Sequence, residues 1–303
     1  MPVGFNESTM ITPTLRSLLS VIAGLACTAG LFAQAAAPKI AFPDASPGAT
    51  LKQRVGLTDV EVSYNRPGMK GRTIFGGLVP YGEVWRTGAN TATKLTFSTA
   101  VKLGGKDIPA GTYELFTIPG PGEWTVIIHK NMSQWGSYAY DPKNDVARFM
   151  AKPSTLTSAV ETMAIGISDV HRDSATMYIS WEKTRVPMKL EVDVVGTLVP
   201  QIEAAMAATE GKKPYFAAAM FYYDNNLDLK KAAAWMDAAI AEQPNQMWMI
   251  YRKGLILAKA GDKAGALAAA QQSLDLVKND TKSPASLKDE YTRLNNALIA
   301  SLK

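Results

Sequence analysis

The chain has 303 residues and a formal net charge of +5, and it is 47% hydrophobic and 19% charged. This length and composition predict a globular protein with room for two ordinary domains, and they exclude an intrinsically disordered chain. The 32 lysine and arginine residues face 27 acidic residues, without a long basic run. Because nucleic-acid binding normally needs clustered cations, we expect no nucleic-acid surface and only a mild preference for anionic partners.

The N-terminal residues predict export. Arg16 precedes an apolar stretch that ends in Ala33-Gln34-Ala35, which is the pattern of a cleavable signal peptide over residues 1–35. We therefore expect a periplasmic or secreted protein with no membrane span after signal cleavage. A retained anchor and lipid attachment at Cys27 are the alternatives. Cys27 is the single cysteine, so the cleaved chain would have no disulfide, thiolate metal site or cysteine nucleophile.

Short runs of alternating apolar residues predict an all-β domain over residues 50–195, after a flexible leader at residues 36–49 that is rich in proline, alanine and glycine. Gly104-Gly105 and residues 119–122 have the composition of hairpin turns. Because no helical period separates the runs, they predict an antiparallel β-sandwich or barrel. The expected strands are residues 58–64, 92–98, 101–103, 106–108, 111–118, 123–129, 147–151, 160–168, 175–181 and 186–194.

Residues 196–303 predict a helical domain, because alanine, leucine, methionine and lysine replace the β-branched residues. Residues 228–240 align with residues 262–274 at an offset of 34, so that Ala232 corresponds to Ala266. This period resembles the tetratricopeptide repeat, a helix pair in which small residues permit close approach. The expected fold is therefore multidomain, β followed by α, with a short tetratricopeptide-like helical array that would contact a protein partner.

The first candidate site is the glycine-rich segment, residues 66–90, whose six glycines and two prolines favour a tightly turned loop. Arginine side chains suit carboxylate or phosphate, and aromatic faces suit sugar rings or apolar groups. In the alternative interpretation, the segment is a structured loop whose arginines bond loop carbonyls or pair with Glu83 and Asp59. The expected ligand-binding residues are Arg66, Lys70, Arg72, Tyr81, Trp85, Arg86 and Asn90.

The second candidate site is residues 134–141, which hold three aromatic residues with polar spacers. Trp135 and Tyr138 could form a carbohydrate-type platform, or the stretch could cap the end of a barrel. Proximity of this stretch to Trp85 in the fold would favour the platform.

No metal site or cofactor is expected. His129 and His171 are the only histidines, which is too few for an ordinary zinc site. Asp141, Asn144 and Asp145 lack the spacing of a helix-loop-helix calcium site, and no phosphate-cradling or dinucleotide motif is present.

Several motifs together resemble one known family. They are Tyr64-Asn65-Arg66-Pro67, Lys70-Gly71-Arg72, Ile74-Phe75-Gly76, Leu78-Val79-Pro80-Tyr81-Gly82, Val84-Trp85-Arg86-Thr87-Gly88-Ala89-Asn90, Ala110-Gly111-Thr112-Tyr113 and Glu123-Trp124-Thr125-Val126. Over roughly residues 40–195 the chain resembles the bacterial domain of unknown function numbered twenty-nine eleven. That family occurs in exported proteins and is often followed by tetratricopeptide-like helices. The resemblance implies this domain layout and export, and it implies no activity, ligand or catalytic residue.

We therefore expect an exported binding module whose β domain engages an anionic or glycan-like small molecule and whose helical domain mediates protein contacts. One alternative is a hydrolase or isomerase in which Glu83 acts as general base beside Arg86 and Tyr81. Another is a non-catalytic scaffold in which the glycine-rich segment is rigid filler. Burial of Glu83 beside two arginines would indicate a structural role, whereas an open position in a pocket together with a raised pKa would make it a catalytic candidate.

Overall fold

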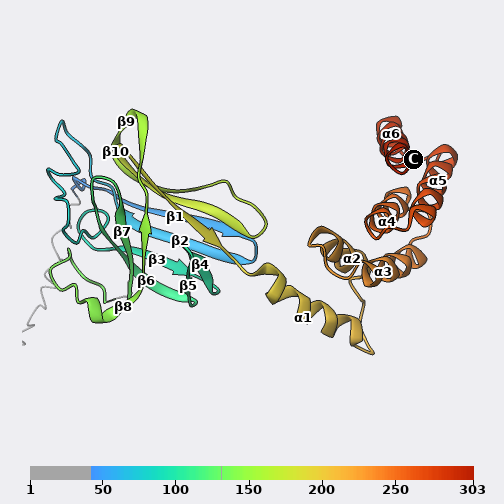
Figure 1. Cartoon of the computed structure of the whole chain (residues 1–303), viewed down its shortest axis with the longest axis horizontal. Coiled ribbons are helices and arrows are strands. Elements are labelled where there is room, and N and C mark those ends of the chain that lie inside the picture. The colour runs from blue at the N-terminus through green and yellow to red at the C-terminus, as the bar shows by residue number, and fades with distance from the viewer. Residues whose placement is uncertain (1–41, 131) are drawn as a thin grey trace, which may run out of the picture. The chain divides into compact units, whose positions relative to one another are not determined.

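The computed structural model describes residues 42–130 and 132–303, so the predicted signal peptide, Cys27 and residues 36–41 of the predicted leader lie outside the described residues. The chain divides into the units Met1–Pro43 and Asp44–Lys303. In the described part, ten strands form two antiparallel sheets and are followed by six α-helices (Figure 1). This order confirms the predicted β-then-α fold.

The larger sheet has the strand order β1-β2-β3-β6-β7-β8, and the smaller sheet has the order β5-β4-β10-β9. A single core cluster contains Val62 and Leu95 of the larger sheet together with Met177 and Leu190 of the smaller sheet. The two open sheets therefore pack face to face as a sandwich. The strands are β1 (Gly48–Val55), β2 (Thr58–Asn65), β3 (Thr93–Phe97), β4 (Val101–Leu103), β5 (Lys106–Ile108), β6 (Gly111–Ile118), β7 (Trp124–Lys130), β8 (Asp145–Ala151), β9 (Ser154–Ser168) and β10 (Ser174–Glu191).

Strand β1 was not predicted, and its first two residues fall in the expected leader at residues 36–49. It pairs with β2 along its whole length, from Gly48 opposite Asn65 to Val55 opposite Thr58. Of its eight residues only Val55 is buried, and Ala49 and Leu51 on the same face are partly buried, so the apolar alternation is weak and is interrupted by the polar Gln53.

Strand β10 is continuous where the sequence pattern predicted two strands at residues 175–181 and 186–194. The polar residues between them suggested a turn, but the chain passes through them with register shifts on both sides of Glu182. Glu182 has a φ of 55°, which marks an irregularity of the strand and not a reversal.

The helices reproduce the predicted 34-residue period. Asp228 caps one helix by accepting from the backbone of Lys230, and Asp262 caps another by accepting from the backbone of Gly265. Gly254 permits close packing, because a Cβ there would lie 3.0 Å from a methyl group of Leu298. The helices are α1 (Val194–Ala207), α2 (Tyr215–Asp224), α3 (Leu229–Glu242), α4 (Met247–Lys259), α5 (Lys263–Asn279) and α6 (Ala285–Ser301). None of these helices has the length and apolar character needed to cross a bilayer.

Candidate functional site

The glycine-rich segment connects β2 to β3 and lies over an aromatic part of the core. The backbone of Trp85 exchanges two hydrogen bonds with Thr117 of β6, at 2.8 and 2.9 Å. The Phe75 ring contacts Trp124 at a centroid distance of 4.8 Å and Trp181 at 6.2 Å. The segment is therefore a fixed structure that brings residues far apart in sequence to one place.

Three of the predicted ligand-binding cations serve the loop itself, through side chain or backbone. Arg66 donates to the carbonyl of Met163 at 2.9 Å, and Arg72 donates to the carbonyls of Gly68 and Met69 at 2.7 and 2.9 Å. The backbone N–H of Lys70 donates to the Glu161 carboxylate, and the Lys70 side chain is exposed. Arg72 thus bonds loop carbonyls, as the structured-loop interpretation expects, and it also borders the cavity described next, whereas Arg66 bonds a carbonyl of β9.

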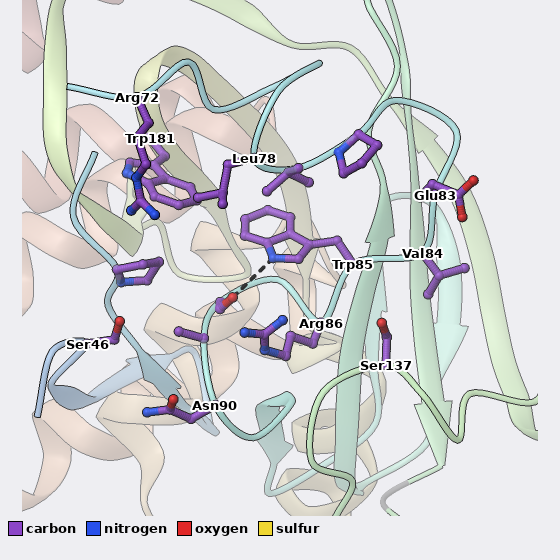
Figure 2. Close-up of a pocket in the computed structure, with 15 residues that line it drawn as sticks. Ser46, Arg72, Leu78, Glu83, Val84, Trp85, Arg86, Asn90, Ser137 and Trp181 are labelled. Atoms are coloured by element: carbon purple, nitrogen blue, oxygen red, sulfur yellow. Dashed lines mark hydrogen bonds between the residues drawn. The ribbon is translucent and has the colours of Figure 1, made fainter. Parts of the chain in front are cut away.

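A cavity of about 420 Å³ opens beside the second half of the segment (Figure 2). Its walls mix apolar residues with hydroxyl, amide and guanidinium groups. It is lined by Ser46, Pro67, Arg72, Leu78, Val79, Pro80, Glu83, Val84, Trp85, Arg86, Gly88, Ala89, Asn90, Ser137 and Trp181. We call it the Arg86 cavity. This volume is in the range of small-molecule sites.

Trp85 is a wall of the cavity and not a stacking surface open to solvent. It is buried, it stacks on Trp181 with a centroid distance of 5.9 Å and an interplanar angle of 21°, and its indole N–H donates to the carbonyl of Gly88 at 3.1 Å. Its polar atom is therefore already paired, and its main contribution is rigidity.

Arg86 differs from the arginines that bond the loop. Its side chain is half-buried, its Nε atom is buried, and no hydrogen bond or ion pair joins its guanidinium to any residue in the described ranges. Burial lowers the pKa of Arg86 from its ordinary value, while the nearby Tyr138 hydroxyl opposes this change. Arginine stays charged in proteins, so Arg86 places an uncompensated cation in the cavity.

The structure brings the two candidate sites together. We call residues 132–141 the aromatic loop. Its Gly136 N–H donates to the carbonyl of Asn90 at 3.0 Å, its Gln134 carbonyl accepts from Ala92 at 3.0 Å, and Trp135 forms a β-bridge with Thr91. Ser137 of the loop lines the Arg86 cavity itself.

Trp135 and Tyr138 form an exposed stack beside this contact. Their ring centroids are 6.3 Å apart with an interplanar angle of 16°, and the two residues are 64% and 88% exposed. Gly136 between them has a φ of 76°, and a Cβ at this position would lie 2.6 Å from the Tyr138 ring. The stack therefore depends on glycine at position 136.

A buried polar cluster, which the sequence patterns did not indicate, anchors the aromatic loop. Glu114 of β6 accepts from the backbone and the side-chain amide of Gln134, at 2.8 and 3.0 Å. The other face of Glu114 meets His129 of β7, with Nδ1 and Oε2 3.6 Å apart, and both side chains are fully buried. At the far end of the loop, Tyr140 donates to Asp145, and burial together with this carboxylate raises the pKa of Tyr140 to about 12.

Glu83 and Tyr81 do not converge with Arg86. Glu83 is exposed at the cavity rim, and Figure 2 shows its carboxylate pointing away from the Arg86 guanidinium. Tyr81 lies against Gly76 and lines a different cavity of about 280 Å³ that also holds Lys152. The three residues of the enzyme alternative therefore form no single catalytic group.

Thr87 holds the backbone next to Arg86 in an unusual conformation. Its φ of 53° is rare for a β-branched residue. The side chain is buried and hydrogen-bonds Thr117 at 3.0 Å, and its carbonyl accepts from the Thr93 hydroxyl at 2.6 Å. Backbone strain of this kind persists where the surroundings enforce it, and it is common at functional sites.

The conformation of Thr87 gives a stability prediction. We expect Thr87→Gly to be more stable than Thr87→Ala by about 1 kcal/mol, because only alanine keeps the Cβ that disfavours a positive φ. Both variants lose the same hydroxyl, so each serves as the control for the other. Urea unfolding measures the difference, and an alanine variant as stable as the glycine variant would contradict the assignment of strain.

The described residues contain no group of three or more His, Cys, Asp or Glu side chains placed to hold a metal ion. His129 is buried in the Glu114 cluster, and His171 is exposed. Asp141 accepts from the backbone of Lys143, and Asp145 accepts from Tyr140 and Arg148. Asp141 and Asp145, which lack the spacing of a calcium site, thus accept hydrogen bonds from neighbouring residues of the chain.

The comparisons with known proteins give one match. Residues 46–190 match the family model described as "Protein of unknown function (DUF2911)". No curated protein and no solved structure matches the chain.

Proposed function

Because residues 46–190 belong to this family, whose description assigns no ligand, we propose from the Arg86 cavity that the β domain binds a small anionic molecule. The observation that carries the proposal is the half-buried Arg86 guanidinium, which has no partner among the described residues. Leaving a buried charged group unpaired is costly, and a bound carboxylate or phosphate would supply the missing hydrogen bonds.

The other walls of the cavity suit the same ligand. Trp85 and Trp181 provide a rigid apolar side, and the polar residues Ser46, Asn90 and Ser137 line the same cavity as Arg86 (Figure 2). A largely preformed site with a few placed polar groups is typical of small-molecule binding. Since Glu83 and Tyr81 point elsewhere, the geometry favours binding over acid-base catalysis by these residues.

The wider setting is part of the proposal. The signal-peptide pattern of residues 1–35 supports a periplasmic or secreted location, and the 34-residue helix period supports a tetratricopeptide-like array that contacts a protein partner. In this account the β domain binds the small molecule and the helical domain provides protein contacts.

Removal of the Arg86 charge tests the binding proposal. Isothermal titration of the purified protein with glucuronate, inorganic phosphate and glucose is expected to show binding of at least one anion and none of glucose. Arg86→Gln should weaken anion binding by about 30-fold or more, because truncating one partner of a buried charged pair costs at least about 2 kcal/mol. Arg54→Gln is the matched control, since exposed Arg54 pairs with Asp59 away from the cavity. Equal binding by the two variants would refute the proposal.

The unpaired state of Arg86 also predicts a stability change without ligand. Arg86→Met should raise the free energy of unfolding by about 1 kcal/mol, at the lower end of the cost of an unpaired polar group because the guanidinium is only half-buried. Unfolding is measured with urea in a buffer that contains few anions. Guanidinium chloride is unsuitable, because the chloride that it adds would itself pair with the unpaired Arg86 guanidinium. A loss of stability in Arg86→Met would show that Arg86 is structural and would support the scaffold alternative.

A further inference from the structure

We propose that the ligand is an acidic oligosaccharide, with the carboxylate of one sugar on Arg86 and a neighbouring sugar ring on the Trp135–Tyr138 stack. This inference rests on the proposed function and names its ligand class. It joins two features that the fold places side by side, the Arg86 cavity and the exposed aromatic stack.

The stack has the form of a sugar-binding surface. Carbon atoms in van der Waals contact are about 3.5–4.0 Å apart, so a centroid distance of 6.3 Å between nearly parallel rings requires a lateral offset. An offset pair leaves part of each ring face uncovered, in agreement with the exposure of Trp135 and Tyr138. The C–H face of a pyranose ring packs on such faces, while its hydroxyl groups remain at the edge.

The stack is also held in place, which distinguishes it from a mobile apolar tip. Trp135 forms a β-bridge with Thr91, and the preceding Gln134 is bonded twice to buried Glu114. A preformed aromatic surface loses little conformational entropy when a ligand binds. Fixed ring faces suit a rigid sugar ring as ligand, whereas the acyl region of a bilayer is deformable and does not need a preformed surface.

The polar lining of the Arg86 cavity suits the same class of ligand. The side chains of Ser46, Asn90 and Ser137 make no hydrogen bond with residues 42–130 or 132–303, so their hydroxyl and amide groups are available to sugar hydroxyls. Ser137 precedes Tyr138 in the chain, and the Tyr138 hydroxyl raises the pKa of Arg86 against the larger effect of burial. Because Ser137 lines the cavity and its neighbour Tyr138 belongs to the stack, we expect a short oligosaccharide to contact both the guanidinium and the stack.

The experiment compares galacturonic acid with its linear trimer by isothermal titration. In the wild-type protein the trimer is expected to bind at least ten times more tightly than the monosaccharide. The double variant Trp135→Ala/Tyr138→Ala should lose this gain and keep the monosaccharide affinity, while Arg86→Gln should lose both. Trp135→Phe should retain most of the gain, because phenylalanine keeps an aromatic face. Both replaced side chains of the double variant are exposed, so its unfolding curve should match that of the wild type.

Other outcomes separate this proposal from the proposed function. If the monosaccharide binds through Arg86 but the trimer gains nothing, or if the double variant keeps the gain, the oligosaccharide proposal fails and anion binding stands. If phosphate binds and neither sugar acid does, the ligand class is wrong although the anion site remains. If the wild-type protein binds anionic phospholipid vesicles, the double variant does not, and the trimer binds no more tightly than the monosaccharide, the stack contacts a membrane surface. That result would overturn the proposal.

Discussion

Glu114→Gln is expected to lower the free energy of unfolding by about 2–3 kcal/mol, because it replaces a buried carboxylate that accepts two hydrogen bonds from Gln134. Both ring nitrogens of His129 face backbone carbonyls, of Lys130 at 2.7 Å and of Asp141 at 3.2 Å. These contacts hold the ring beside Glu114, whose Oε2 lies 3.6 Å from Nδ1 of His129. A glutamine amide would also place its own N–H groups against the donors of Gln134 or His129. Urea unfolding at pH 7 measures the loss.

The control for this prediction is Glu123→Gln, because Glu123 is exposed in the turn before β7. Surface substitutions of this kind change stability by about 0.5 kcal/mol or less. A loss below about 1 kcal/mol in Glu114→Gln would contradict the assignment of Glu114 as the buried acceptor that holds Gln134. Since Glu114 holds Gln134, the variant should also weaken any ligand contact made by the aromatic loop.

Gly104→Ala is expected to destabilise the β domain by about 2–5 kcal/mol, from the strain of a positive φ together with overpacking. Gly104 has a φ of 55°, and a Cβ at this position would lie 2.1 Å from the ring of buried Phe149. Neither the β4–β5 turn nor the ring can move without disturbing the core. Thermal or urea unfolding measures the effect.

Gly105→Ala is the matched control in the same turn. Its φ of 77° imposes a similar backbone strain, but no atom lies within 4 Å of the added Cβ. The control should therefore cost about 1–2 kcal/mol, and the difference between the two variants isolates the clash with Phe149. Equal losses in the two variants would refute the packing interpretation.

Much of the fold could be predicted from the sequence, because its strands have one buried face. Apolar alternation located β2, β3 and β6, and the paired glycines located the β4–β5 turn. The errors at β1 and β10 have one physical cause. Where few side chains of a strand are buried, the sequence pattern does not show where the strand begins or ends. Strand β1 buries one residue, and β10 continues through polar residues by means of an irregularity at Glu182.

The candidate site could be predicted only in part. The composition of the glycine-rich segment singled out Arg86 and Asn90, but it did not distinguish Arg86 from Arg66 or Arg72, whose partners are backbone carbonyls. Hydrogen bonds to carbonyls depend on the folded path of the chain and leave no mark in the residue pattern. The structure alone identifies which cation lacks a partner among the described residues.

Two further features needed the fold. Ser137 and Trp181 also line the cavity, although they are about 50 and 100 residues from Arg86 in the sequence. Only the folded structure shows that they lie at the same site. Glu114 offered a usable signal, because a carboxylate between Tyr113 and Leu115 in an apolar strand is unusual unless it is paired. Its partners, Gln134 and His129, could not be named from the sequence.

Because Arg86 is proposed as the anion-binding group, an experiment that observes its guanidinium during titration distinguishes binding from a structural role. In a ¹H–¹⁵N spectrum of the arginine Nε–H groups, the Arg86 signal is identified by its absence in Arg86→Lys. Titration with glucuronate or phosphate is predicted to shift this signal saturably. The Arg72 signal should move little, because its Nε already donates to the carbonyl of Met69. An Arg86 signal that stays unmoved by both anions would contradict the account.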